Sequence, residues 1–387
     1  MKQNVLHELF EKQAIVNPNN DALKCGDEVI TYQELDKRSS QFSNYLISLG
    51  VQSGDVVKIC IERSIEMFIG IFGILKCGAA YLPIETEISD ERLSFICNDN
   101  SHPLFISKWA ISTKYTTVIE SLQIVNLDTD WGHIEKTSAL KKEVVFTKES
   151  PAVVLYTSGS TGKPKGVLLS HFALSNHILW NKEAYDISSK EVFLQHASYT
   201  FDFSLLEIFL ALGSGSLLVL SRPKFHYESF YLLDLIQKER ISILCSVPSL
   251  LKTYVMYEAF SKCTSLTKVI LGGEVLDTKL VRDFFEKSTA KLINTYGPTE
   301  CSIAVLHWIC DRNSRSTSIP IGRPVAGMKI HILNENKVPV KKGEVGEIYI
   351  SGPGLAQGYY RRPELTSNHF TINEFNERMY KTGDLGS

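Results

Sequence analysis

The chain has 387 residues, 44% of them hydrophobic, and a formal net charge of −2. Its length allows a large buried core and exceeds that of one simple domain. The near-zero charge argues against a nucleic-acid partner or a membrane surface, and no apolar run approaches the roughly 20 residues of a membrane span.

The start of the chain and its cysteines indicate the compartment. Residues 1–8 lack the apolar core of a signal peptide. Eight cysteines are scattered singly, without a Cys-x-x-Cys pair, as is typical of reduced thiols in cytosolic proteins. We therefore expect a cytoplasmic protein without a zinc site.

The first third of the chain alternates helix and strand signals. Apolar residues recur at helical spacing over residues 5–14 and 35–49, and Thr31 and Glu34 form a capping box before the second helix. This alternation predicts an α/β architecture. The expected strands cover residues 22–25, 56–60, 105–107 and 124–127.

A glycine-rich stretch follows a polar segment at 128–150. Residues 155–166 read LYTSGSTGKPKG, preceded by a strand at 152–156 and followed by residues 167–171, which are expected to open a helix. Glycines let backbone N–H groups approach an anion, and lysines and hydroxyls add donors without bulk. The stretch therefore predicts a cradle for a polyphosphate.

The same stretch is not a Walker A loop. That motif places four residues between its first Gly and the Gly-Lys pair, with Ser or Thr after it. Here only two residues separate Gly159 from Gly162, and Pro164 follows Lys163. The alternative is a plain surface loop, for which Gly and Ser are ordinary residues, but two closely spaced lysines favour the phosphate role.

Asp202 lies between Phe201 and Phe203, just before a predicted helix. A carboxylate in apolar surroundings needs a partner or shifts its pKa. The simplest role is a helix N-cap, which Asp fills well. A binding role is the alternative, and this pattern alone leaves both open.

Two predicted strands end in polar turns. The strand expected at 268–271 runs into a Gly-Gly-Glu turn, and the strand expected at 291–294 runs into the segment NTYGPTE. Ligands of open α/β sheets collect beyond the carboxyl ends of strands. Tyr296 offers a ring for adenine, and Glu300 offers a hard oxygen for Mg²⁺.

From residue 318 the pattern changes to short strands, expected at 329–333 and 347–350, with turns between them. We expect a small β-rich lobe here. The chain ends soon after Asp384, within the segment YKTGDL, and a carboxylate at this place can accept from both hydroxyls of a ribose.

The glycine-rich stretch and the segments NTYGPTE and YKTGDL resemble the signature motifs of adenylate-forming enzymes. That superfamily includes acyl- and aryl-CoA ligases, firefly luciferase and the adenylation domains of nonribosomal peptide synthetases. Further similar motifs make the resemblance cover nearly the whole chain. It implies an adenylation core of residues 1–387 with two stacked α/β lobes, approximately 1–190 and 191–315, and a small distorted β-barrel lobe at 316–387.

The resemblance implies that a carboxylate attacks the α-phosphorus of ATP, giving an acyl-AMP and pyrophosphate, while the protein positions the groups and neutralises charge. Tyr296 and Asp384 would hold the nucleoside, and Glu300 would be the Mg²⁺ ligand. The implied catalytic residues are Thr161, Lys163, Lys165 and Glu300. The residues implied to bind ATP are Thr157, Ser158, Gly159, Ser160, Thr161, Gly162, Gly272, Gly273, Glu274, Asn294, Thr295, Tyr296, Gly297, Thr299 and Asp384.

Asp202 places the chain closest to the peptide-synthetase adenylation domains, in which an aspartate at this position binds the α-ammonium group of an amino acid. Apart from Thr295, the implied side-chain pocket offers no strong polar group, and a buried charge would be unpaired there. We therefore expect an apolar amino acid. The implied substrate-binding residues are Asp202, Phe203, Leu206, Cys245, Ile270, Gly272, Thr295, Ile303 and Ala304.

Family members carry a further mobile C-terminal domain that supplies a lysine for adenylation and admits the thiol acceptor, and this chain stops before it. We expect weak adenylation by this chain and later transfer to the phosphopantetheine thiol of a peptidyl or acyl carrier protein. The start at Met1 suggests a stand-alone or initiating module. The alternatives are a fatty- or aryl-acid CoA ligase, in which Asp202 would be only a cap, and a catalytically inactive nucleotide-binding module.

Overall fold

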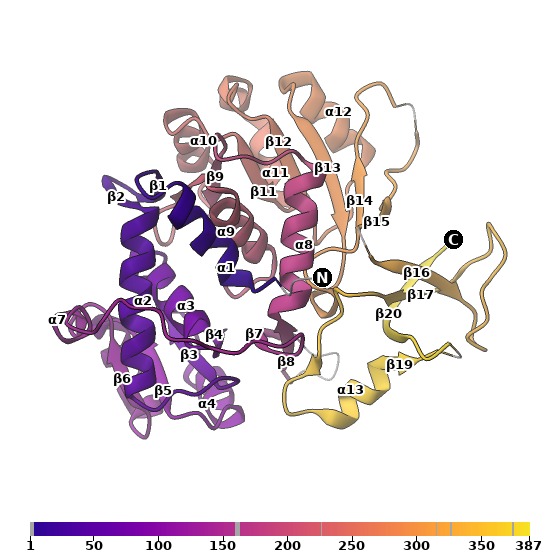
Figure 1. Ribbon diagram of the computed structural model, residues 1–387. Coiled ribbons are helices and arrows are strands. Elements are labelled where there is room, and N and C mark those ends of the chain that lie inside the picture. The colour runs from indigo at the N-terminus through magenta and orange to yellow at the C-terminus, as the bar shows by residue number, and fades with distance from the viewer. Residues whose placement is uncertain (1–3, 159–162, 226, 315, 326, 374) are drawn as a thin grey trace.

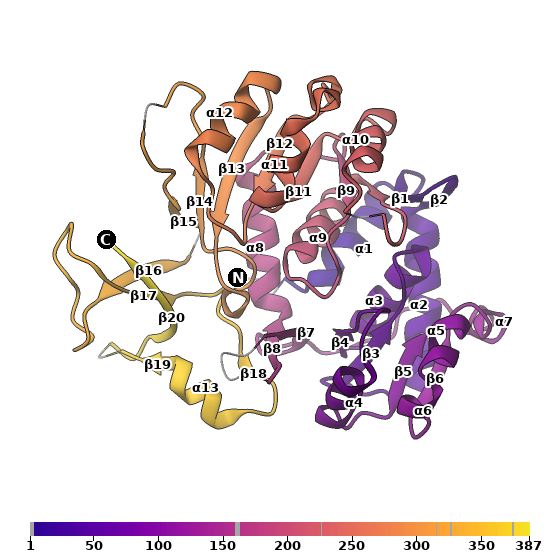
Figure 2. The same ribbon diagram turned by 180° about the vertical axis from the view of Figure 1, so that it is seen from behind.

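The computed structural model describes residues 4–158, 163–225, 227–314, 316–325, 327–373 and 375–387. Its strands form sheets of nine, seven and four strands. The two large sheets lie next to each other, and the four-stranded sheet stands apart from them on the side of β13 to β15 (Figures 1 and 2). The α/β class predicted from the alternation of helix and strand signals is confirmed.

The seven-stranded sheet has the order β18-β8-β7-β4-β3-β5-β6. Its central strands are parallel, whereas β8 pairs antiparallel with β7, and β18 with β8. The strands are β3 Val56–Cys60, β4 Ala80–Pro83, β5 Leu104–Ser107, β6 Gln123–Asn126, β7 Pro151–Thr157, β8 Lys165–Ser170 and β18 Gly358–Tyr359.

The strand β8 corrects one expectation from the sequence. Residues 167–170 do not open a helix but continue β8, because they pair with β7 and, on the other side, with β18. The helix begins only at His171, where the Ser170 hydroxyl accepts a hydrogen bond from the backbone N–H of Ala173. The described residues on either side of the glycine-rich stretch, Thr157 and Lys165, are therefore paired strand residues and do not form a strand-to-helix junction.

The nine-stranded sheet has the order β15-β14-β13-β12-β11-β9-β10-β1-β2. The strands from β13 to β1 in this order are parallel, and antiparallel strands close both edges. Because β1 and β2 come from the start of the chain, the strand pairing does not follow the expected lobe limit near residue 190. The strands are β1 Asp21–Cys25, β2 Glu28–Thr31, β9 Val192–Gln195, β10 Leu217–Leu220, β11 Ile243–Ser246, β12 Lys268–Leu271, β13 Lys291–Tyr296, β14 Leu306–Ile309 and β15 Arg323–Pro324.

The β-rich region near the end of the chain is a four-stranded antiparallel sheet in the order β16-β17-β20-β19. It places Asp384 on its longest strand, facing the end of β13. The strands are β16 Lys329–Leu333, β17 Gly346–Ser351, β19 Phe370–Ile372 and β20 Arg378–Gly386.

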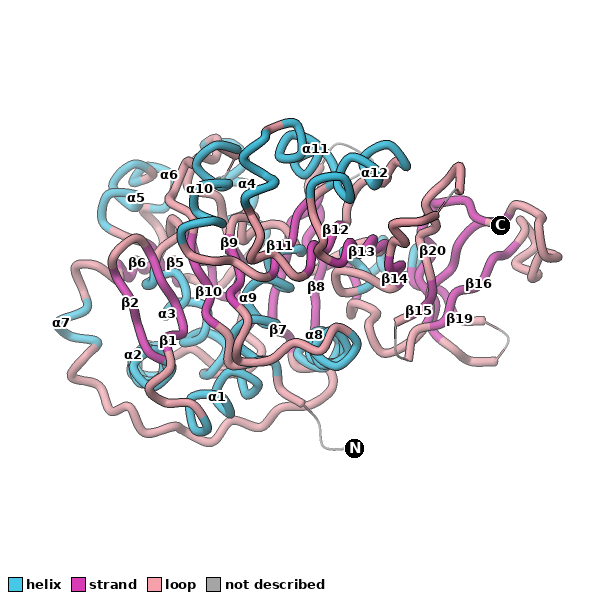
Figure 3. Tube along the Cα trace, turned by 90° about the horizontal axis from the view of Figure 1, so that it is seen from above, coloured by secondary structure: helices cyan, strands magenta, loops and turns pink. Residues whose placement is uncertain are grey.

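Helices cover both sides of the strands, with α1, α2 and α8 on one side and α4, α10, α11 and α12 on the other (Figure 3). All residues of α9, and all of α3 except Glu66, are buried. Among the described residues, the helices are too short or too polar to traverse a bilayer. The helices are α1 Leu6–Val16, α2 Tyr32–Ser48, α3 Ile65–Lys76, α4 Asp90–Asp99, α5 Trp109–Lys114, α6 Thr116–Ile119, α7 Trp131–Ile134, α8 His171–Ala184, α9 Phe203–Ser214, α10 Ser229–Lys238, α11 Pro248–Met256, α12 Thr278–Lys287 and α13 Pro363–His369, with 3₁₀ turns η1 Glu258–Lys262 and η2 Thr299–Cys301.

The buried hydroxyl of Tyr199 joins the two large sheets. Tyr199 follows β9 of the nine-stranded sheet, and its oxygen lies 3.0 Å from the Ile59 carbonyl and 2.7 Å from the Ile84 carbonyl, at the ends of β3 and β4. The oxygen also accepts a hydrogen bond from the Ile61 N–H at 3.1 Å. This one side chain therefore satisfies buried backbone groups of the other sheet.

We expect Tyr199→Phe to lower the free energy of unfolding by about 1–3 kcal/mol, because it removes the hydroxyl that pairs with the buried Ile61 N–H and the Ile84 carbonyl. The urea midpoint measures this loss. Tyr45→Phe is the matched control, since the half-buried Tyr45 hydroxyl has no hydrogen bond with the described residues. Equal midpoints for the two variants would contradict the bridging role.

Candidate active site

The glycine-rich stretch lies at the tip of the β7–β8 hairpin, where Thr157 pairs with Lys165. Ser158 and Lys163 are exposed next to the tip. The expected phosphate-binding residues Gly159, Ser160, Thr161 and Gly162 lie outside the described residues, so their role stays a prediction.

Lys165 begins β8 and points at Glu300. Its Nζ lies 2.9 Å from Glu300 Oε1 and 2.8 Å from the Tyr359 hydroxyl. The Tyr359 hydroxyl also donates to Glu300 Oε1 at 2.7 Å. The three side chains come from β8, from the turn after β13 and from β18. We call them the Glu300 cluster.

The Glu300 cluster keeps its carboxyl group ionised. Burial by itself would raise the pKa of Glu300, but the hydrogen bond and the charge of Lys165, together with the Tyr359 bond, outweigh it and lower the pKa. An ammonium group has three donors, and Lys165 uses two of them within the cluster. Its third donor has no partner among the described residues and is available to an anion.

Sequence reasoning gave no site role to Tyr359. Its residue type and its place after Gly358 were visible, but nothing local predicts that its hydroxyl meets Glu300. Burial and the charge of Glu300 raise the pKa of Tyr359, so the phenol keeps its proton and acts as a donor.

A metal ion would find one suitable carboxylate here. Both bonds that Glu300 accepts from other side chains fall on Oε1, and Oε2 has no side-chain partner among the described residues. No group of three or more His, Cys, Asp or Glu residues in the described part of the chain could hold a metal by itself. Mg²⁺ is commonly held by one or two carboxylates together with substrate phosphates, and Glu300 fits that mode.

A cavity of about 340 Å³ opens beside the Glu300 cluster, and we call it the Tyr296 cavity. It lies beyond the carboxyl ends of β12 and β13, as the sequence predicts. The predicted residues that line it are Gly273, Glu274, Asn294, Thr295, Tyr296, Gly297 and Asp384. Sequence reasoning missed the apolar lining by Val275, Leu276, Ile319 and Ile321, because no motif or period marks these loop residues.

The two residues predicted to bind the nucleoside, Tyr296 and Asp384, are hydrogen-bonded to each other across this cavity. The Tyr296 hydroxyl donates to Asp384 Oδ2, which joins the end of β13 to β20. Burial and this bond raise the pKa of Tyr296, so its phenol stays protonated. The exposed Asp384 keeps its second oxygen free of protein bonds among the described residues and available to a hydroxyl.

Three of the residues predicted to bind ATP also stabilise the fold around the Tyr296 cavity. Glu274 accepts hydrogen bonds from the N–H and the hydroxyl of Ser249, both at 2.8 Å, at the start of α11. The Asn294 side chain donates to the Pro320 carbonyl at 3.0 Å and fixes the loop that carries Ile319 and Ile321. A Cβ at Gly297 would lie 2.5 Å from the Cα of Ala304, so packing alone requires glycine there.

Asp202 is not a helix cap. Its backbone has helical angles, with φ −59° and ψ −28°, and its side chain makes no cap hydrogen bond. Instead, Oδ2 accepts from the Thr299 hydroxyl at 2.6 Å. Burial raises the pKa of Asp202 to about 6 and the charge of Glu300 adds to this, although the Thr299 bond opposes it.

The expected side-chain pocket is divided by the ring of Phe203. A Cβ at Gly272 would lie 2.8 Å from this ring and 2.7 Å from the Thr295 hydroxyl, so the ring fills the space over Gly272. Phe203 and Cys245 line a separate cavity of about 200 Å³, the Phe203 cavity. The remaining expected residues are buried and line neither of these two cavities: Leu206, Ile270, Gly272, Ile303 and Ala304.

Comparison with known proteins gives a family-level match. The model of the family "AMP-binding enzyme" matches residues 10–360. The chain is 37% identical to tyrocidine synthase 3 of Brevibacillus parabrevis over 98% of its own length and 6% of that protein. It is also 37% identical to zwittermicin A synthase ZmaJ of Bacillus cereus, over 98% of its length and 73% of that protein.

Solved structures agree with this match. The nonribosomal peptide synthetase FmoA3 superposes with a TM-score of 0.93 at 27% identity, covering 99% of this chain and 41% of that one. The same protein has been solved with AMPPNP and with α-methyl-L-serine-AMP. The chain thus spans a small part of several relatives and most of others.

We expect Asp202→Asn to stabilise the chain near pH 8. The folded pKa of about 6 lies above the ordinary aspartate value of 3.8, so ionised Asp202 lowers stability fully above about pH 6, and this cost vanishes below about pH 4. The gain is on the order of 2 kcal/mol, read from thermal or urea unfolding at pH 8 and pH 4. A helix cap would predict little change at either pH, because Asn caps a helix about as well as Asp.

Proposed function

Since the chain belongs to the AMP-binding enzyme family, we propose that it activates the carboxylate of an amino acid with ATP, forming an aminoacyl-AMP and releasing pyrophosphate. One observation carries the proposal. Thr299 bonds the buried Asp202, and the next residue, Glu300, bonds Lys165. A site for an ammonium group therefore adjoins a site for phosphates.

Asp202 would bind the α-ammonium group of the substrate. It is 7% exposed and has only the neutral Thr299 hydroxyl as a side-chain partner among the described residues. A buried carboxylate without a cation is costly. An ammonium group would supply the missing charge and place the substrate carboxylate near Lys165.

Lys165 would neutralise the charge that develops at the phosphates, and the Glu300 cluster would hold it in place for this. Its ammonium group is fixed by two bonds before any ligand arrives, so little reorganisation is needed during the reaction. Glu300 Oε2 would hold Mg²⁺, which when bound neutralises charge on the phosphate oxygens. Lys163 and the residues at the hairpin tip, Thr161 among them, would add further donors.

The Tyr296 cavity would hold the nucleoside. Tyr296 and the apolar Ile319 and Ile321 offer surfaces for a base. The free oxygen of Asp384 would accept from the ribose hydroxyls.

We expect the amino acid to be apolar. The Thr295 hydroxyl is already used, because it donates to the Leu271 carbonyl at 2.7 Å. The remaining expected lining has no charged group to partner a charged side chain. Later transfer to the phosphopantetheine thiol of a carrier protein and a cytoplasmic location belong to the same proposal.

The test is ATP–pyrophosphate exchange with this chain, and with any longer natural protein that contains it, over the proteinogenic amino acids, hydroxybenzoates and fatty acids. We expect exchange with apolar amino acids and at least about a tenfold loss on Asp202→Asn, because a charge-assisted hydrogen bond is lost. Preference for Lys, Arg, Asp or Glu would refute the apolar pocket. Preference for acids without an amine would refute the role of Asp202.

The pH dependence gives a separate prediction. Because the ionised form of Asp202 binds the ammonium group and its pKa is about 6, the KM for the amino acid should rise by about tenfold per pH unit as the pH falls well below 6. Glu300 has a lowered pKa and stays ionised in this range, so the KM for ATP should change less. A flat amino-acid KM between pH 7 and pH 5 would contradict the assignment.

A further inference from the structure

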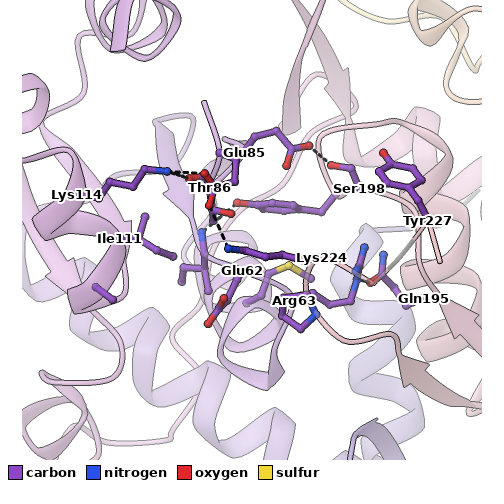
Figure 4. Close-up of a pocket in the computed structure, with 16 residues that line it drawn as sticks. Glu62, Arg63, Glu85, Thr86, Ile111, Lys114, Gln195, Ser198, Lys224 and Tyr227 are labelled. Atoms are coloured by element: carbon purple, nitrogen blue, oxygen red, sulfur yellow. Dashed lines mark hydrogen bonds and ion pairs between the residues drawn. The ribbon is translucent and has the colours of Figure 1, made fainter. Parts of the chain in front are cut away.

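A cavity of about 430 Å³ lies where loops of the two large sheets meet, and it shares no lining residue with the Tyr296 cavity (Figure 4). We call it the Arg63 cavity. Its volume is within the range of small-molecule sites. Its lining residues lie at or after the carboxyl ends of five strands, β3, β4 and β5 of the seven-stranded sheet and β9 and β10 of the nine-stranded sheet.

The strand order places this cavity at a switch point of the seven-stranded sheet. β3 lies between β4 and β5, and the chain passes from β3 to β4 on one side but from β5 to β6 on the other. In open α/β sheets, ligands bind in the crevice that such a divergence leaves beyond the strand ends. The fold therefore builds a crevice here, independently of the Glu300 cluster.

Arg63 brings a cation without a direct ion pair among the described residues to this crevice. Burial lowers the pKa of Arg63, and the charges of the nearby Glu207 and Glu85 oppose this. Its guanidinium group bonds the Gln195 side-chain oxygen and the carbonyls of His196 and Ala197, which are neutral acceptors. None of the ion pairs among the described residues includes Arg63, although an arginine fork can bind a carboxylate with two donors. Figure 4 shows Arg63 beside Gln195 at one side of the cavity.

Two carboxylates that line the cavity have no direct ion pair among the described residues. Glu62 is exposed and makes no hydrogen bond or ion pair with the described residues. Among these residues Glu85 accepts hydrogen bonds from the hydroxyls of Ser198 and Thr200, and its charge acts on Arg63. The third carboxylate, Glu87, is already shared by two lysines at the rim, Lys114 at 2.7 Å and Lys224 at 3.7 Å.

We propose that the Arg63 cavity binds a free amino acid as a zwitterion. Its carboxylate would bind Arg63, its ammonium group would bind Glu62 and Glu85, and its side chain would lie against Ile61, Met67 and Ile111. A simple anion would meet two unpaired carboxylates, and a simple cation would meet Arg63. A ligand that carries both charges offers a partner of opposite charge to Arg63 and to the carboxylates.

This site is distinct from the one proposed for activation, and it does not depend on that function. The Arg63 cavity adjoins the Phe203 cavity, since Ser198 and Tyr227 line both. Asp202 lines neither of them. Removing the Asp202 charge therefore leaves the second site intact and separates the two binding events.

The test is calorimetric titration of the Asp202→Asn chain with each of the twenty amino acids, followed for the best binder by its analogues lacking the amine or the carboxylate. We expect one binding event in this variant and an affinity at least about tenfold lower for both analogues, since each loses a charge-assisted hydrogen bond. Absence of binding by all twenty, or equal binding of an analogue with one charge, would overturn the proposal.

Two pairs of substitutions, each made in the Asp202→Asn chain, test whether the amino acid binds in the Arg63 cavity. Glu62→Gln removes an unpaired carboxylate and should lower the affinity about tenfold or more, whereas Glu120→Gln, an exposed neutralisation outside the cavity, should not. Ala110→Phe should fill the cavity and abolish binding. Thr113→Phe, exposed on the same helix and outside the lining, should preserve it; equal effects within either pair would place the ligand elsewhere.

The wild-type chain distinguishes failure of this proposal from failure of the proposed function. Two binding events, one removed by Asp202→Asn and one by Ala110→Phe, support both. A single event that only Ala110→Phe removes supports the Arg63 cavity and refutes the role of Asp202 in activation. A single event that only Asp202→Asn removes supports the role of Asp202 in activation and refutes the proposal for the Arg63 cavity.

Discussion

The ion pair between Lys165 and Glu300 holds together three segments that are distant in the sequence. Lys165 begins the second strand of the hairpin, Glu300 follows β13, and Tyr359 on β18 bonds to both. Because Glu300 is only 6% exposed, its charge requires these partners. The same contacts that stabilise the junction of the sheets therefore place a fixed cation and an ionised carboxylate beside the Tyr296 cavity.

Asp202 differs from the Glu300 cluster, because its ionised carboxylate lowers the stability of the fold instead of raising it. It is buried with only neutral partners among the described residues, the Thr299 hydroxyl and the Phe203 N–H, and burial raises its pKa. Such a residue is poorly explained as part of a scaffold. A ligand that brings a positive charge would offset the cost, which is why the same residue is a candidate for selecting the substrate.

Both large sheets have a switch point, and a cavity lies at each. In the nine-stranded sheet β9 lies next to β11, and the Phe203 cavity is lined by residues that follow these two strands. In the seven-stranded sheet the Arg63 cavity has the same relation to β3 and β5. Tyr199 and Arg63 form hydrogen bonds between the two sheets. The contacts that stabilise the interface between the sheets therefore also shape the two cavities.

The sequence by itself determined the α/β class, most strands and the polar turns after β12 and β13, because these depend on local periodicity and residue type. It did not determine that residues 167–170 form a strand, since the pairing of β8 with β7 and β18 is a tertiary choice. Nor could it join Lys165 to Glu300 and Tyr359, which lie 135 and 194 residues away. Only the folded backbone decided where the Asp202 carboxylate lies, because helical angles at that residue keep its side chain from the cap position and direct it to Thr299.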